Sequence, residues 1–159
     1  TWVGMLALMV AGVLGLVVMV MNNPRLQSLM KIVGWVGFGF YTAGVGFSMI
    51  ASDMSWGSVF FQEPRMAAAL NMVATGLIVM IAVTFLSPSR FTGLLPPAYA
   101  VLLLFSTFGA ELVLHPRNPI RNSSSSAIQL TFLGMTVIYG LTAVWISLHW
   151  YKRETIPKI

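Results

Sequence analysis

The stretch WVGMLALMVAGVLGLVVMVM, residues 2–21, decides the fold class because it contains no charged side chain. A helix needs about 20 predominantly apolar residues to cross the hydrocarbon core of a bilayer, which is about 30 Å thick. Asn22, Asn23 and Pro24 follow directly, and residues of these types are typical of helix ends. Residues 2–21 are therefore predicted to form a membrane-spanning helix.

Four further apolar runs have the length of a span. Together with the first run they give predicted spans at residues 2–21, 32–51, 66–86, 96–114 and 127–148. Ser87-Pro88 and His115-Pro116 mark the ends of the third and fourth runs, and Ser126 opens a capping-box pattern at the start of the fifth. The predicted fold is a single all-α transmembrane domain, a bundle of five helices with short loops.

The composition of the whole chain also indicates a membrane protein. Of its 159 residues, 57% are hydrophobic and 8% are charged, whereas about 25% are charged in an ordinary soluble domain; the mean hydropathy is +0.84. The chain has no cysteine, which excludes disulfides, thiolate metal sites, iron–sulfur clusters and cysteine nucleophiles. The basic residues sit in short connectors, so we expect anionic lipids as partners rather than nucleic acid.

The distribution of basic residues over the connectors predicts the orientation. Because the number of spans is odd, the two termini lie on opposite sides. One side carries six basic residues, Arg25, Lys31, Arg90, Lys152, Arg153 and Lys158, and the other carries three, Arg65, Arg117 and Arg121. The positive-inside rule then places the C-terminus in the cytoplasm and the N-terminus outside, for a multi-pass protein of an inner or plasma membrane. Aromatic residues are predicted to mark both membrane boundaries, the cytoplasmic one at Trp35, Tyr99, Trp145, Trp150 and Tyr151 and the outer one at Trp2 and Trp56.

Small residues recur at four-residue spacing on two of the predicted spans, which is typical of closely packed membrane helices. They are Ala7, Ala11 and Gly15 in the first span, and Gly39, Ala43, Gly44 and Ser48 in the second. Two uses stay open for these faces. They pack within this one bundle, or they receive a partner helix, a flat cofactor or a lipid tail.

A carboxylate and a histidine near the end of the fourth predicted span are the main candidates for a polar site. Glu111 is predicted about one turn inside the span, and His115 four residues later on the same helix face. Asn71 and Gln129 are predicted at a similar depth on other spans. Ionisable side chains inside membranes usually face the bundle or a wet cavity. The alternatives are a structural pair, proton or cation transfer, and a hydrogen bond to a bound headgroup, quinone or substrate.

Basic residues at span ends are candidate contacts for lipid headgroups. Two of them, Arg117 and Arg121, lie in the fourth connector, and two others, Lys152 and Arg153, end the fifth span. Clusters of Lys and Arg next to a membrane span attract anionic lipids.

Motifs for catalysis and cofactor binding are missing from the sequence, which contains no Walker A loop, dinucleotide glycine fingerprint, HExxH or GxSxG. His115 and His149 lie at opposite membrane faces in the predicted topology, which excludes haem ligation by both within one chain. Glu111 and His115 are two ligands where a tetrahedral zinc site takes about three from the protein. We predict no metal or cofactor in this chain, and expect quinone, haem or chlorophyll only in neighbouring subunits.

These patterns favour a non-catalytic membrane subunit of a larger complex, of the electron-transfer or bioenergetic kind. Such a subunit would pack against other membrane subunits through its small-residue faces and border a lipid or quinone site. The alternative is a small homo-oligomeric carrier or channel for protons or cations, with Glu111 as its titrating group. A lipid-modifying enzyme built on Glu111 is a third hypothesis.

Overall fold

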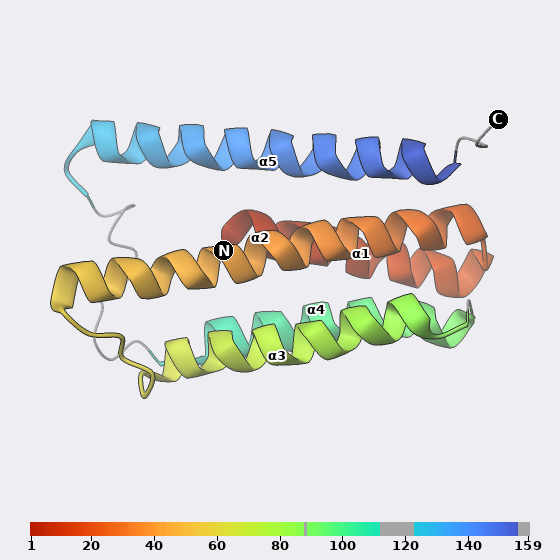
Figure 1. Ribbon diagram of the computed structural model, residues 1–159, viewed down its shortest axis with the longest axis horizontal. Coiled ribbons are helices and arrows are strands. Elements are labelled where there is room, and N and C mark those ends of the chain that lie inside the picture. Colours follow the sequence, from red (N-terminus) through yellow and green to blue (C-terminus); the bar gives the residue numbers. More distant parts are fainter. Residues whose placement is uncertain (88, 112–122, 156–159) are drawn as a thin grey trace.

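The computed structural model describes residues 1–87, 89–111 and 123–155. These residues contain five α-helices and no strand (Figure 1). The helices are α1 (Trp2–Met21), α2 (Pro24–Trp56), α3 (Pro64–Phe85), α4 (Arg90–Gly109) and α5 (Ser126–Thr155). All five are long and apolar enough to cross a membrane. The prediction of an all-α fold with five helices of spanning length is confirmed.

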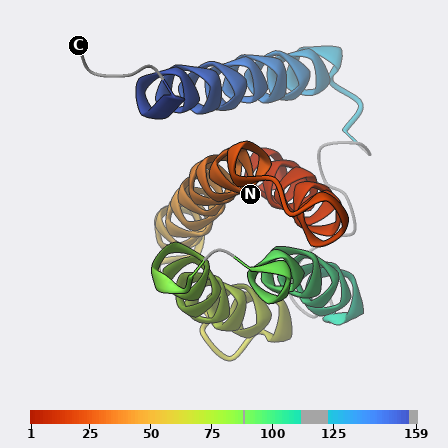
Figure 2. The same ribbon diagram turned by 90° about the vertical axis from the view of Figure 1, so that its right-hand side faces the viewer.

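Four of the helices form a closed bundle, and α5 lies outside it (Figure 2). α1 and α3 each pack against both α2 and α4, so that α1–α4 surround one core. α5 contacts mainly α2, with a smaller contact to α1. Successive helices run in opposite directions. The Asn22–Asn23 turn, the start of α4 and the end of α5 therefore lie at one end of the molecule, named here the Asn22 end (Figure 1).

A two-residue turn joins α1 to α2. Asn22 adopts the left-handed conformation (φ 48°, ψ 42°), and its N–H donates to the Val18 carbonyl at 2.8 Å. Asn23 caps α2, since its side-chain oxygen accepts from the Arg25 N–H at 2.9 Å. Pro24 takes the first helical position, where a missing N–H breaks no hydrogen bond. α2 therefore begins eight residues before the predicted span. With 33 residues, it is about 50 Å long.

The ends of α4 and α5 also differ from the predicted spans. α4 begins at Arg90, six residues early, because Ser89 and Thr92 form a capping box there. It ends at Gly109, five residues early. α5 continues to Thr155, seven residues beyond the predicted end. Apolar runs locate segments of membrane length, whereas caps set where each helix begins and ends.

Glycines bring α1 close to α2 and α4. A Cβ at Gly4 would overlap the backbone of α2, and a Cβ at Gly37 would lie 2.9 Å from the backbone nitrogen of Leu8 in α1. On the other side, a Cβ at Gly15 would lie 2.5 Å from the carbonyl oxygen of Gly93 in α4. The bundle therefore depends on positions where only hydrogen fits between two backbones.

Candidate functional site

Glu111 does not lie where the sequence predicts it. α4 ends at Gly109, and Ala110 has extended backbone angles, so Glu111 lies two residues beyond the helix with its side chain exposed. The prediction that Glu111 and His115 share one face of the fourth helix is therefore wrong at Glu111. His115 itself lies outside the described residues.

The other members of the predicted polar site are also on the surface. Asn71 is exposed on α3, and Gln129 is exposed on the first turn of α5, where its Nε2 donates to the Ser123 carbonyl at 2.9 Å. Within residues 1–87, 89–111 and 123–155, the side chains of Asn71 and Glu111 form no hydrogen bond or ion pair. No group of three potential metal-ligating residues lies together in that part of the chain. A titrating role for Glu111 stays a prediction.

Of the aromatic residues expected at the cytoplasmic boundary, Tyr99 lies inside the bundle instead, whereas Trp35 is partly buried beside the last turn of α3. Tyr99 is 3% exposed in the middle of α4, because α4 begins nine residues before it, and its hydroxyl donates to the Met72 carbonyl at 2.8 Å. A Cβ at Gly76 would overlap the Tyr99 ring, so this glycine makes room for the phenol. The Trp35 Nε1 donates to Thr84 Oγ1 at 2.9 Å, which links α2 to α3. These hydrogen bonds join helices and stabilise the bundle.

A second buried polar contact links α2 to α4 at the Asn22 end. Gln27 is 4% exposed, and its Nε2 donates to the hydroxyl oxygen of Thr92 at 3.1 Å. That hydroxyl donates in turn to the Ser89 carbonyl at 2.7 Å within the capping box. All of these groups are neutral and paired, so this contact is structural.

The small residues singled out in the sequence divide into two sets. Inside the bundle or against α1 lie Ala7, Ala11, Gly15 and Gly44. On the surface lie Gly39, Ala43 and Ser48. A Cβ at Gly39 would meet nothing within 4 Å, whereas one at Gly44 would overlap Thr1. Packing within the bundle therefore accounts for the first set and leaves the second set exposed.

α5 meets the bundle along one narrow stripe. Its two buried residues in the described structure are Ala143 and Ser147, which lie on one helix face four residues apart. On α2 the stripe meets Ile32 and Val36, which form a small core with Ala143. The Phe40 and Tyr139 rings, 6.4 Å apart, lie further along the same contact. Ala143 of α5 thus packs on larger side chains of α2, mainly near the Asn22 end.

Beyond this stripe the contact between α2 and α5 opens. No side chain of α5 is buried between residues 127 and 142. Gly39 and Ala43 follow Val36 at helical spacing on the same face of α2, and both are exposed. We name the surface formed by Gly39 and Ala43 of α2 and residues 127–142 of α5 the α2–α5 face. Figure 2 shows α5 standing apart from the four-helix bundle.

Large apolar side chains are exposed along residues 127–142 of α5. They include Ile128, Leu130, Leu133, Val137, Ile138 and Leu141, which are all at least half exposed. Leu130, Ile138 and Leu141 lie on the side of α5 that faces away from the Ala143–Ser147 contact with α2. The face has no charged residue, so it is suited to an apolar occupant rather than to water. No family model, curated protein or solved structure matches this chain. The arrangement of the helices is therefore the basis for inferring function.

Proposed function

We propose that this chain is a non-catalytic subunit of a larger membrane protein complex, and that the α2–α5 face binds a transmembrane helix of a neighbouring subunit. The position of α5 carries the proposal. α1–α4 close around their own core without α5, whereas α5 keeps a narrow contact with α2 and has no fully buried side chain between residues 127 and 142. In this proposal the cofactors of the complex, such as quinone, haem or chlorophyll, belong to the neighbouring subunits.

The small residues of α2 favour a helix over lipid as the occupant of this face. Lipid tails are as apolar as Leu side chains, so membrane helices associate through close packing rather than through apolar burial. Gly39 and Ala43 expose the backbone of α2 to such packing. The chain already uses the same chemistry where Ala143 and Ser147 of α5 meet α2. A partner helix against Gly39 and Ala43 would extend that interface along the same face of α2.

A single alanine substitution tests the proposal. Ala43→Leu fills the exposed small-residue face of α2, and Ala74→Leu makes the same change at an exposed position of α3. The measurement is native mass after gentle detergent extraction from the native membrane, with an absorption spectrum of the particle. We expect wild type and Ala74→Leu to be extracted as a large heteromeric particle, and Ala43→Leu as the free chain.

Two results would contradict the proposal. One is a wild-type chain that is extracted as a colourless monomer or homo-oligomer, which would favour the carrier or channel. The other is equal assembly of the two leucine variants, which would show that the α2–α5 face is covered by lipid.

A further inference from the structure

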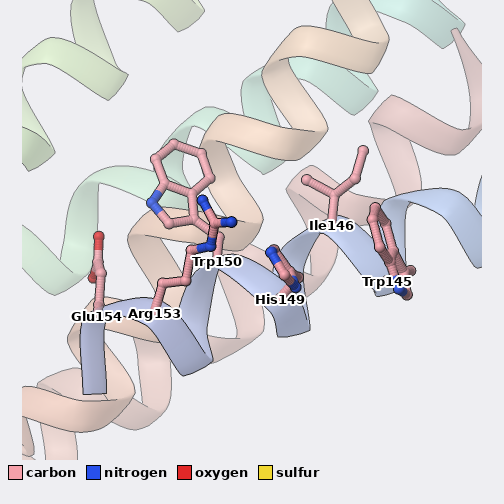
Figure 3. Close-up of a pocket in the computed structure, with 6 residues that line it drawn as sticks. All are labelled: Trp145, Ile146, His149, Trp150, Arg153 and Glu154. Carbon is pink, nitrogen blue, oxygen red and sulfur yellow. The ribbon is translucent and has the colours of Figure 1, made fainter. Parts of the chain in front are cut away.

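A pocket on α5 at the Asn22 end combines apolar and charged walls (Figure 3). Its volume is about 620 Å³, and its lining residues are Trp145, Ile146, His149, Trp150, Arg153 and Glu154. Along α5 the apolar members come first and the charged members come in the last turn. All six residues belong to one helix, so the pocket is an open depression along the side of α5 rather than an enclosed cavity. This sequence of apolar residues followed by charged residues along the helix suits a molecule with an apolar body and a charged head.

Basic residues of α2, which do not line the pocket, lie near its charged end. The Ser28 hydroxyl donates a short hydrogen bond to the Glu154 carboxylate, which places the start of α2 beside the end of α5. Arg25 and Lys31 lie one turn before and one turn after Ser28 on the same side of α2, and Arg153 lines the pocket itself. None of these three cations forms an ion pair with another described residue. The cluster is therefore positive despite the carboxylate of Glu154.

We propose that this pocket binds an anionic phospholipid, with the phosphate at Arg153 and the acyl chains along the apolar wall. A guanidinium group binds phosphate oxygens through two parallel hydrogen bonds. Tryptophan rings such as Trp150 prefer the level where headgroups meet acyl chains. The site is independent of the α2–α5 face, because it lies at the opposite end of α5 from most of that face.

The geometry favours a phospholipid over a quinone. A quinone head is flat and neutral, so it would gain little from the cations and would need a slot between rings. Trp145 and His149 stack on each other instead, with ring centroids 5.3 Å apart and planes inclined by 16°. This stacking fills the space that a quinone ring would occupy between them.

Native mass spectrometry of the purified full chain in detergent tests the proposal. The probes are phosphatidylglycerol and phosphatidylcholine with the same acyl chains, added at equal concentration. Arg153→Gln removes the proposed phosphate contact, and Arg90→Gln is the matched control, an exposed arginine at the same end that does not line the pocket. We expect wild type and Arg90→Gln to retain more phosphatidylglycerol than phosphatidylcholine. In Arg153→Gln the ratio of retained phosphatidylglycerol to retained phosphatidylcholine is expected to fall about fivefold.

Three results would overturn the proposal. Equal retention of the two lipids by wild type would remove the anionic preference. Equal losses in the two arginine variants would show a general charge effect. Displacement of phosphatidylglycerol by glycerol phosphate at the same concentration would show a site for a free phosphate compound. Because Arg153 is exposed, unchanged thermal unfolding of Arg153→Gln is expected, and it separates a lost contact from a lost fold.

Discussion

A Cβ atom on Gly15 of α1 would lie 2.5 Å from the carbonyl oxygen of Gly93 in α4 and 2.7 Å from the Cδ atom of Pro97. Neither atom can move without shifting α4. Gly15→Ala is therefore expected to separate the two helices and to lower the free energy of unfolding by about 1–3 kcal/mol, as overpacked cores do. Thermal unfolding in detergent micelles, followed by circular dichroism, measures the change.

Gly134→Ala is the matched control for this substitution. Gly134 lies within α5, and a Cβ there would meet nothing within 4 Å. Alanine has the higher helix propensity, so we expect unchanged or slightly raised stability. Equal losses in the two variants would show that the approach of α1 to α4 does not limit the stability of the bundle.

Tyr99→Phe tests the hydrogen bond between α4 and α3. The substitution removes the hydroxyl that donates to the Met72 carbonyl at 2.8 Å and keeps the ring beside Gly76. We expect a loss of about 1 kcal/mol in the free energy of unfolding. Tyr139→Phe serves as the control, since Tyr139 is 47% exposed and should tolerate the change. A Tyr99→Phe protein as stable as the control would mean that this hydrogen bond contributes nothing.

The sequence predicts the helices better than their ends, and the reason is local chemistry. α1 has the predicted bounds because Asn22 and Asn23 cap the two helices on either side of the turn. α4 does not, because its capping box at Ser89 lies before two internal prolines, and the predicted apolar run begins only at the first of them. The sequence predicts Glu111 inside a helix because the apolar run continues past Gly109, where α4 ends.

Whether a small-residue face is exposed depends on which helices pack against it. The spacing of residues along the sequence does not determine that packing. Ala7 and Ala11 have the same four-residue spacing as Gly39 and Ala43, yet the first pair is covered by the bundle and the second is exposed. The difference arises because α5 leaves the side of α2 after Val36 and Phe40. Tyrosine is likewise a residue type that often lies at the membrane interface. Tyr99 is nevertheless buried in the core, because α4 extends nine residues before it.

Glu111→Gln distinguishes the proposed subunit from the alternative carrier. The side chain is exposed beyond α4 and unpaired within the described residues. We expect the free energy of unfolding to change by less than about 0.5 kcal/mol. In liposomes with a pH gradient, we expect no proton-linked flux from wild type or variant. Flux in wild type that disappears in Glu111→Gln would identify the carboxylate as a coupling group and contradict the subunit proposal.

Two introduced cysteines can report where α5 sits, because the chain has none of its own. Ser28 and Glu154 are hydrogen-bonded to each other across α2 and α5. In a protein with Ser28→Cys and Glu154→Cys, the two thiols are therefore expected to lie near each other and to be joined by a short bis-maleimide cross-linker. The rate of cross-linking, followed by gel mobility, measures how firmly the end of α5 is held against α2.

Ala143→Leu, added to this cysteine pair, tests what holds α5 in place. Ala143 is 6% exposed in the stripe that meets Ile32 and Val36, so a leucine there should push α5 away and slow the cross-linking several-fold. Ala127→Leu makes the same change at an exposed position of α5 and should leave the rate unchanged. If the two variants cross-link at the same rate, the small-residue stripe does not hold α5. The chain would then offer no precedent for the binding of a further helix to α2 through Gly39 and Ala43.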